Sequence, residues 1–296
     1  MGEYERMTSS PKFEDYIALW LLRLAKLRRR RLRTTTNEDC EGFYDQFFEQ
    51  KDLEAYEEDV RLKTRRETML EWFTGHMPGE AELLDVGCGI GDVLASLPKT
   101  YRLHGMDFSQ ANVQLVRKRL GPRADIHQGS IYEIPFVSES MDICLALEVL
   151  EHIEDSGRGV REIARVLKPG GVLIASVPYT FYWPDYLRLI GHFRHFTRDS
   201  FTQLMHDNGL KTEHYLPNYP RWHQTYSRRY ALIRAQSIVF GRLLGNRSVY
   251  SFKWPWQRQS ALTKLEQKLE SLRELDKRMD YPREKTSTFL VARKPG

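Results

Sequence analysis

The chain has 296 residues, of which 41% are hydrophobic and 29% are charged, and its formal net charge is +5. This composition predicts a folded protein with a sizeable core and excludes a disordered or fibrous chain. Three cysteines, far apart and odd in number, argue against a disulfide framework and favour a reducing, cytoplasmic compartment. The longest apolar run near the start, residues 17–22, is much shorter than the roughly 20 residues that span a membrane. Arginines follow this run, whereas in a signal peptide the charges precede it.

The first predicted element is a basic amphipathic extension over residues 1–40. Its aromatic and aliphatic residues recur at helical spacing and end in the basic tip Arg28–Arg31, as in helices that lie on a membrane surface. A second helical pattern, residues 41–73, is expected to end at the glycines of residues 75–79.

Short apolar runs then alternate with helical patterns, which predicts a parallel sheet covered on both faces. The predicted strands are residues 81–86, 101–106, 124–128, 141–147, 172–177, 210–216 and 287–293. The predicted helices between them are residues 92–97, 109–120, 156–167 and 198–208. Residues 41–216 are therefore interpreted as the core domain with a helical cover, residues 217–285 as a basic, aromatic and helical insertion, and residues 286–296 as the last core strand.

The most specific motif is a glycine-rich turn that joins the first predicted strand to a helix. Gly87, Gly89 and Gly91 occupy alternate positions, where glycine permits positive φ and lets a ligand approach the backbone. A dinucleotide site has the spacing G-x-G-x-x-G, but this turn has G-x-G-x-G. Asp85 and Asp92 flank the turn and would repel a pyrophosphate, whereas they suit a ligand with an ammonium group.

The second predicted strand leads into Asp107. An acid at this place accepts hydrogen bonds from ribose hydroxyls in nucleoside-binding sheets, and the neighbouring Phe108 could stack on a purine. The alternative for Asp107 is a helix N-cap, a role that Ser109 could take instead.

These residues resemble the class I S-adenosylmethionine-dependent methyltransferases, and most closely the branch with ubiquinone, menaquinone, sugar and small-molecule methyltransferases. The motif at Leu84–Asp92 carries the resemblance, supported by residues 128–131, 141–152 and 167–171. The resemblance implies a Rossmann-like, seven-stranded, mostly parallel sheet with an antiparallel last strand. It also implies S-adenosyl-L-methionine as the cofactor.

The family's binding roles carry over by position. The resemblance places Gly87, Gly89 and Gly91 around the methionine part of the cofactor and Asp107 on its ribose. It also implies that Ser130 and Ile131 border the adenine. Glu148 is implied to face the sulfonium end. Many relatives have an aspartate where this chain has Ser130.

Two histidines are candidates for the acceptor side. His152 and His195 follow predicted strands at the edge where open α/β sheets bind ligands, and histidine titrates near neutral pH. A general base is needed only if the acceptor is a hydroxyl or a similar acid. Each histidine could instead have a capping or packing role, and Arg194 could contact an anionic acceptor. No Cys/His cluster has metal-ligand spacing, so the sequence predicts no metal.

Positive charge is concentrated in two segments. Residues 23–33 contain seven basic residues and residues 221–265 contain nine, and neither segment contains an acid. The second segment also holds eight aromatic residues. Such a mixture suits either an anionic membrane surface or RNA, but it also occurs on solvated cover helices.

The leading hypothesis is an S-adenosylmethionine-dependent methyltransferase, cytoplasmic and peripheral at the membrane. It would transfer a methyl group to a hydroxyl or similar nucleophile of a small or lipid-linked, anionic acceptor. One alternative is an RNA methyltransferase that binds RNA through the basic segments. Another is a non-catalytic protein that retains the cofactor site.

Overall fold

The computed structural model describes residues 60–177, 192–216, 267–268, 270–274 and 288–296. The chain divides into two compact units, residues 1–35 with 219–279 and residues 36–218 with 280–296. The second unit contains the sheet. In the first unit, the described residues are helical and lie between residues 267 and 274. The predicted extension over residues 1–40 lies outside the described residues, as does nearly all of the insertion over residues 217–285.

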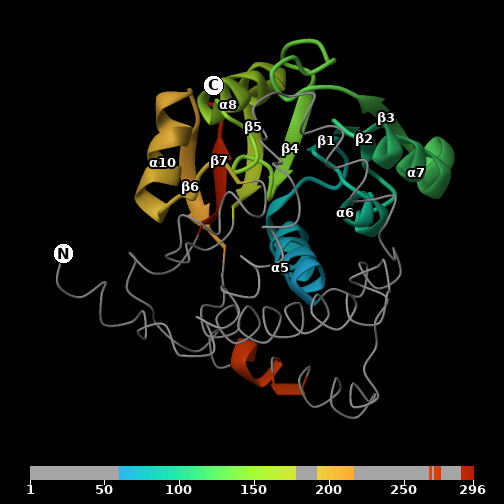
Figure 1. Ribbon diagram of the computed structural model, residues 1–296, viewed down its shortest axis with the longest axis horizontal. Helices are drawn as coiled ribbons and strands as arrows, with labels where there is room; N and C mark the ends of the chain where they lie inside the picture. Colours follow the sequence, from blue (N-terminus) through green and yellow to red (C-terminus); the bar gives the residue numbers. More distant parts are fainter. Residues whose placement is uncertain (1–59, 178–191, 217–266, 269, 275–287) are drawn as a thin grey trace, which may run out of the picture. The chain divides into compact units, whose positions relative to one another are not determined.

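Seven strands of the described chain form a single sheet (Figure 1). Their order is β3-β2-β1-β4-β5-β7-β6, and β7 runs antiparallel to both of its neighbours, whereas the other pairs are parallel. This arrangement confirms the predicted Rossmann-like, mostly parallel sheet with an antiparallel last strand. The strands are β1 Glu82–Val86, β2 Arg102–Asp107, β3 Ala124–Gln128, β4 Met141–Leu147, β5 Leu167–Ser176, β6 Lys211–Tyr215 and β7 Phe289–Arg293.

Helices cover the sheet because successive strand side chains point to opposite faces. Leu84 and Cys144 belong to one buried cluster with side chains of α8 and α10. Leu83 and Ile143, one position earlier on the same strands, belong to the other cluster with α5, α6 and α7. The helices are α5 Val60–His76, α6 Asp92–Ser96, α7 Gln110–Leu120, α8 Ser156–Val166 and α10 Arg198–Asp207, and a 3₁₀ turn follows α7 at Gly121–Arg123.

Two element boundaries of the described residues differ from the prediction by three residues or more. Helix α5 continues through Gly75, since the amide of Met77 still donates to the carbonyl of Phe73 at 3.1 Å. A single glycine inside a helix costs only about 1 kcal/mol, so this position need not end it. Strand β5 begins at Leu167, and the Pro-Gly-Gly stretch expected only as a helix stop lies within the strand, where Gly170 and Gly171 bond to Lys294.

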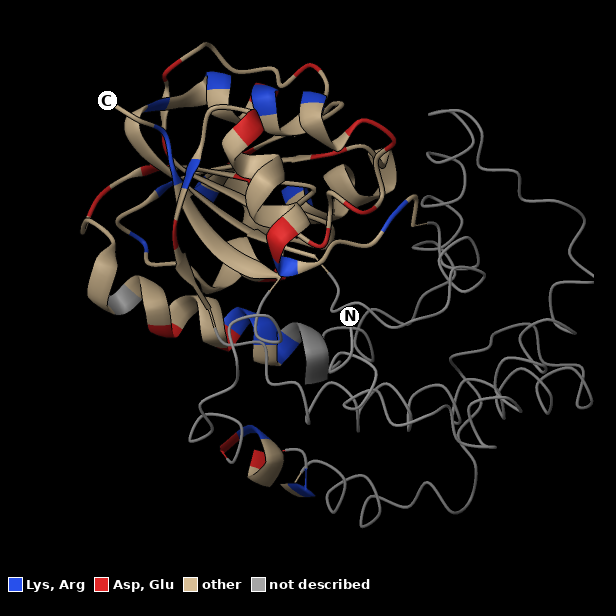
Figure 2. Ribbon diagram, turned by 90° about the vertical axis from the view of Figure 1, so that its left-hand side faces the viewer, with Lys and Arg blue, Asp and Glu red and all other residues tan. Residues whose placement is uncertain are grey.

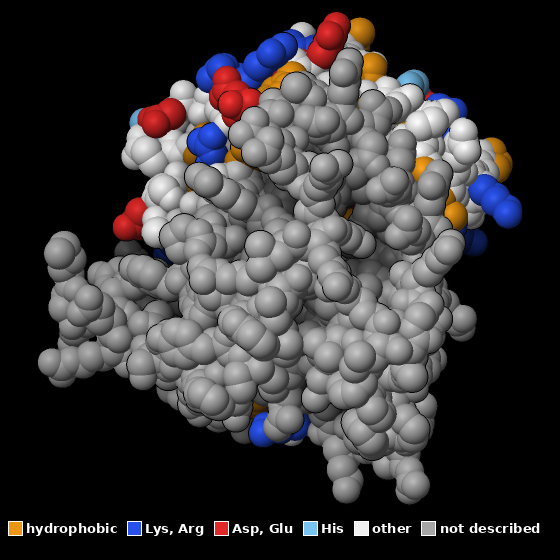
Figure 3. All heavy atoms as spheres, in the orientation of Figure 1, with side chains coloured by type: hydrophobic (Ala, Val, Ile, Leu, Met, Phe, Trp, Pro, Cys, Tyr) orange, Lys and Arg blue, Asp and Glu red, His pale blue; other side chains and the backbone are white. Residues whose placement is uncertain are grey.

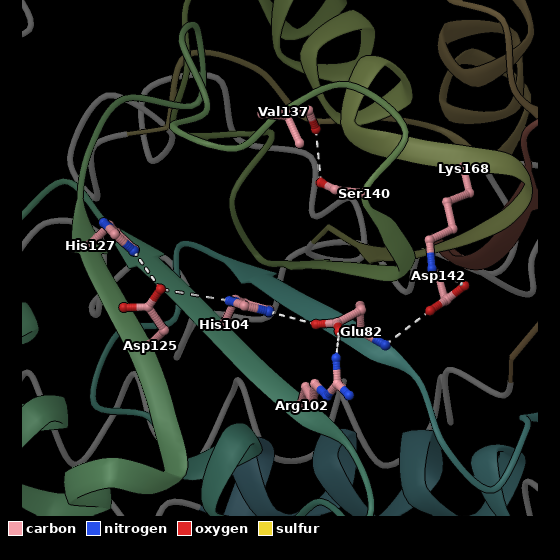
Figure 4. Close-up of polar contacts among 9 residues, drawn as sticks. All are labelled: Glu82, Arg102, His104, Asp125, His127, Val137, Ser140, Asp142 and Lys168. Carbon is pink, nitrogen blue, oxygen red and sulfur yellow. Dashed lines mark hydrogen bonds and ion pairs between the residues drawn. The ribbon is translucent and has the colours of Figure 1, made fainter.

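Polar contacts join neighbouring strands at the edge of the sheet where several of them begin (Figure 4). Glu82 contacts Arg102 at 2.7 Å and His104 at 2.9 Å, which connects β1 to β2. The backbone amide of Glu82 donates to Asp142 on β4, whose other carboxylate oxygen accepts from Lys168 on β5. These contacts stabilise the beginning of the sheet and leave its carboxyl edge for a ligand.

The charged residues of the described chain are of both signs. Lys and Arg as well as Asp and Glu are scattered over the ribbon of the sheet-containing unit (Figure 2). On the face drawn in Figure 3, the described acidic and basic side chains lie near one another. Cys88 and Cys144 are buried free thiols, and Cys40 lies outside the described residues. Within the described residues, no helix has the length and apolar character that crossing a membrane requires.

Candidate cofactor and acceptor site

The glycine-rich turn connects β1 to α6, and its three positions require glycine for two different reasons. Gly87, Gly89 and Gly91 all have positive φ, at 71°, 54° and 71°. A Cβ at Gly87 would lie 2.6 Å from a methyl group of Val149, and one at Gly91 would lie 2.7 Å from Val116. No heavy atom lies within 4 Å of a Cβ built on Gly89. Packing therefore requires the outer two glycines, whereas Gly89 leaves space beside the backbone for a ligand.

Asp107, at the end of β2, is held directly against this turn. Its Oδ2 accepts a hydrogen bond from the amide of Gly89 at 2.8 Å. Its Oδ1 accepts from the amide of Ser109 at 2.9 Å and from the side chain of Asn112 at 3.1 Å. Ser109 is the N-cap of α7, so Asp107 does not have the capping role considered as its alternative. The acid and the glycine turn thus form one preorganised site.

Two more acids lie on the helix α5 side of the turn. Asp85 is buried, and burial, together with the carboxylates of Asp92 and Asp107, raises its pKa well above the usual range against the opposing effect of Arg65. Asp92 pairs with Arg66 of α5 at 3.2 Å. A cationic group of a ligand would be favoured here, because it would stabilise the ionised form of Asp85.

The three residues expected near the adenine differ in their surroundings. Phe108 is half-buried beside Asp107. The Ser130 hydroxyl accepts a hydrogen bond from the amide of Tyr132 at 3.2 Å. The Ile131 side chain is buried in the core against Gly159 of α8. Any contact of Ile131 with the adenine would therefore come mainly from its backbone.

Glu148 follows β4 in a strained backbone conformation. Its φ is 59°, a value that residues other than glycine adopt rarely. The carboxylate accepts a hydrogen bond from Ser176 at 3.0 Å and lies 3.7 Å from the guanidinium of Arg65. The carboxylate that the resemblance places at the sulfonium end is thus fixed between β5 and α5.

Beyond Glu148, the structure brings together groups that are far apart in the sequence. His152 Nε2 lies 3.6 Å from a carboxylate oxygen of Glu151, and its ring meets that of His192 edge to face at a centroid distance of 4.4 Å. His192 Nδ1 lies 2.8 Å from His195 Nε2. The predicted candidates His152 and His195 are therefore linked through His192. Neither His192 nor Glu151 was predicted, although both lie within three residues of a predicted candidate.

Burial changes the acid-base properties of this cluster. Burial, together with the carboxylate of Glu148, raises the pKa of Glu151 well above its usual range. Burial also lowers the pKa of His195 to about 4, so the expectation that this histidine titrates near neutral pH is wrong. His195 is a neutral imidazole at pH 7. Arg194 is exposed and donates a hydrogen bond to the carbonyl of Glu154.

A doubly wound sheet with an open glycine turn and an acid after its second strand defines a nucleoside-binding α/β domain. Comparison with known proteins makes this class specific. Residues 84–175 match the family described as "Methyltransferase domain". Residues 84–175 thus form a methyltransferase domain, and the relatives that this part of the chain resembles are S-adenosylmethionine-dependent methyltransferases.

Two relatives illustrate the relationship. A Mycolicibacterium smegmatis protein named "probable S-adenosylmethionine-dependent methyltransferase" is 36% identical over 117 residues, which are 38% of this chain and 44% of that protein. A ubiquinone biosynthesis O-methyltransferase of Azorhizobium caulinodans is 33% identical over 98 residues, which are 32% and 39% of the two chains. The chain thus spans less than half of each relative.

The fold is also that of a solved methyltransferase structure. Phosphoethanolamine N-methyltransferase 2 of Haemonchus contortus, in complex with S-adenosyl-L-methionine, is 18% identical with a TM-score of 0.52. The similarity covers 79% of this chain and 53% of that one.

The described residues fit S-adenosylmethionine. Gly89 leaves space for a ligand beside its backbone, and Asp107 is fixed next to it. The acids Asp85 and Asp92 complement the ammonium group of the methionine part. Gly89 and Asp107 are positions to which the family resemblance assigned cofactor contacts, and those contacts stay predictions.

Proposed function

We propose that the protein transfers the methyl group of S-adenosylmethionine to an oxygen nucleophile of a small or lipid-linked acceptor. The observation that carries this proposal is the group of imidazoles at His152, His192 and His195, beside the buried Glu151, just beyond the strand end that holds Glu148. Such groups suit an acceptor that must lose a proton, as a hydroxyl does. The Azorhizobium relative, an O-methyltransferase by name, supports oxygen as the acceptor atom.

In this proposal, the chain mainly orients the reactants. The cofactor, when bound, supplies an electrophilic methyl group on a sulfonium sulfur. Asp107 and the turn at Gly89 would hold its nucleoside part, and Asp85 would interact with its ammonium group. Because displacement at a methyl group needs little covalent help, alignment of the two reactants provides most of the rate.

The proton of the acceptor would pass to the histidine cluster. His152 would accept this proton, since it lies four residues after Glu148, the residue expected at the sulfonium end, and follows the same strand β4. His195 is a neutral imidazole at pH 7 and would act by orienting His192.

We further propose that the acceptor is anionic and that the protein works at the cytoplasmic face of an anionic membrane. Support comes from the sequence: the two acid-free basic segments, residues 23–33 and 221–265, together with the amphipathic pattern of residues 1–40. Cosedimentation with anionic liposomes should occur at low salt, decrease with added salt, be weak with neutral liposomes and disappear when residues 1–33 are deleted. Absence of cosedimentation at low salt would reject the membrane role. Tight binding to structured RNA in the same buffer would favour the RNA methyltransferase instead.

The type of acceptor atom can be read from the methylated product itself. The full chain is incubated with S-adenosylmethionine carrying a ¹³C-labelled methyl group and with the low-mass and lipid fractions of a cell extract. The ¹³C chemical shift of the labelled product distinguishes a methyl group on oxygen from one on nitrogen or carbon. We expect an O-methyl product. Label only on nitrogen or carbon, or only in the RNA fraction, would contradict the proposal.

A further inference from the structure

The acceptor-side cluster also has the composition of a metal site, although no metal was expected from the sequence. Glu151, His152 and His192 each offer one ligand atom, and these atoms all lie within 4.8 Å of one another. Glu151 and His152 follow β4, whereas His192 comes from the segment before α10. A sequence motif with fixed ligand spacing could not reveal this site, since its third member is 40 residues away from the second.

Glu151 is the strongest sign that something is bound here. Its side chain is fully buried, and neither of its carboxylate oxygens has a hydrogen-bond partner. A buried carboxylate without donors is costly in free energy unless it is neutralised or coordinates a cation. The guanidinium of Arg65, which is close enough to lower the pKa of Glu151, is paired with Glu148 at 3.7 Å. A bound cation would neutralise this carboxylate and coordinate one of its oxygens.

The two histidines are held in place by other contacts. The hydrogen bond between His192 Nδ1 and His195 Nε2 fixes the plane of the His192 ring. Metal-bound imidazoles commonly have such a bond at their second nitrogen, and its partner orients the ligand. His195 is half-buried, so this supporting contact is itself shielded from water.

The backbone also holds the two contributing segments together. The amide of Phe193, directly after His192, donates to the carbonyl of Glu151 at 2.8 Å. Phe196 lies in the same segment and is buried in the main core cluster. The arrangement of Glu151 and His192 is therefore built into the fold.

We propose that Glu151, His152 and His192 bind a divalent transition-metal ion, with Zn²⁺ as the preferred occupant. Two imidazoles and one carboxylate match the ligand set of catalytic zinc sites, which leave a fourth position for water or substrate. His195 is a positioning residue that acts through His192. The site begins three residues beyond Glu148, so an acceptor oxygen in the fourth position would be close to the sulfonium end. With the ion bound, the metal and not His152 would promote loss of the acceptor's proton. Only this last role rests on the proposed function.

Metal binding is tested on the tag-free full chain after removal of metals with a chelator. Zn²⁺ is titrated against a chromophoric competitor, and Co²⁺ is added separately to record the visible absorption of a low-coordinate site. We expect one Zn²⁺ per chain. In Glu151→Gln and His192→Ala, affinity should fall by more than the roughly 10–100-fold that loss of a supporting contact costs. In His195→Ala, the loss of Zn²⁺ affinity should lie within that 10–100-fold range.

His206→Ala is the matched control, because this histidine lies on the exposed surface of α10 and should leave Zn²⁺ affinity unchanged. Circular dichroism melts establish that each variant is folded, and His152→Ala replaces Glu151→Gln if the latter does not fold. Wild-type protein that binds no stoichiometric Zn²⁺, or folded ligand variants with wild-type affinity, would overturn the metal site. Intact binding of S-adenosylmethionine in the same samples would show that the cofactor site stands independently.

Discussion

The backbone amide of Gly89 donates a hydrogen bond to Oδ2 of Asp107 at 2.8 Å. Gly89 belongs to the turn after β1 and Asp107 to the end of β2, so this contact connects the two parts of the cofactor site. The same carboxylate accepts from the amide of Ser109 at the start of α7. The site is thus organised by the protein's own hydrogen bonds, and both residues should affect cofactor affinity.

A side chain at Gly89 should block the cofactor. Gly89→Leu should lower the affinity for S-adenosylmethionine by at least about tenfold, equivalent to 1.4 kcal/mol, because the side chain would enter the open space beside the turn. Gly121→Leu is the matched control, since Gly121 also has positive φ and open space but follows α7. Both variants should lose about 1–3 kcal/mol of stability from backbone strain. Equal cofactor affinity in the two variants, measured by calorimetry, would contradict this role of Gly89.

Binding of S-adenosylmethionine should release protons through Asp85. Burial raises the pKa of this carboxyl group in the free protein, so a fraction is protonated at mildly acidic pH, and a cationic ligand favours the ionised form. Affinity should therefore rise as pH rises through this pKa. Calorimetry in two buffers with different protonation enthalpies measures the proton release. Asp85→Asn should remove it, and a wild-type affinity that falls with pH in this range would rule out the linkage.

Glu162 should stabilise the fold above acidic pH. Hydrogen bonds from Arg165, helped by the amide of Ile134, lower the pKa of Glu162 despite partial burial. Because this folded-state pKa is depressed, the stabilisation is present above the unfolded value of about 4.3 and is lost as pH falls through the folded pKa. Glu162→Gln should reduce the free energy of unfolding by about 1–2 kcal/mol at pH 7 in urea.

The control for this substitution is Glu139→Gln, because Glu139 is 56% exposed and its pair with Lys294 spans 3.4 Å. Its effect at pH 7 should be below about 0.5 kcal/mol. The difference between wild type and Glu162→Gln should shrink as pH falls below about 4. A difference that stays constant down to the acid transition would show that the charge of Glu162 is not the cause.

Removal of a histidine from the acceptor side should affect turnover more than cofactor binding. If the acceptor hydroxyl loses its proton to this cluster, His152→Ala or His195→Ala should reduce turnover by about 10²–10⁴. Affinity for S-adenosylmethionine should stay close to wild type, and His206→Ala on α10 should change neither quantity. Full turnover in both variants would mean that alignment of the reactants is sufficient or that the base lies elsewhere.

The sequence predicted the sheet well because the local signals agree with the fold. Residues 124–128 and 141–147 were predicted with the bounds of β3 and β4. The turn residues Gly121-Pro122 and Gly129 enclose the first, and the second is an apolar run interrupted only by Asp142. The glycine turn was equally readable, because a ligand-binding backbone needs glycine at fixed positions. In contrast, β5 begins directly after α8 and contains the Pro-Gly-Gly stretch, because Gly170 and Gly171 pair with Lys294 next to the distant last strand.

The acceptor side was less predictable because it depends on contacts between remote segments. The sequence indicated His152 and His195 but gave no sign that His192 lies between them. Nor could it show that the carboxyl group of Glu151 is buried without a donor, since burial follows from packing of the whole domain. The pKa of His195 departs from the ordinary histidine value for the same reason.

The central claim is that the turn at Gly89 and the acid at Asp107 bind S-adenosylmethionine. Isothermal titration of the full chain with S-adenosylmethionine tests it most directly, with Asp107→Ala beside Asp125→Ala, an exposed acid on β3. Wild type and Asp125→Ala should bind one molecule with equal affinity. Asp107→Ala should bind more weakly by about 1–3 kcal/mol, the cost of losing hydrogen bonds to a charged acceptor. No binding to the wild-type chain, or equal affinity in Asp107→Ala, would contradict the assignment of this site.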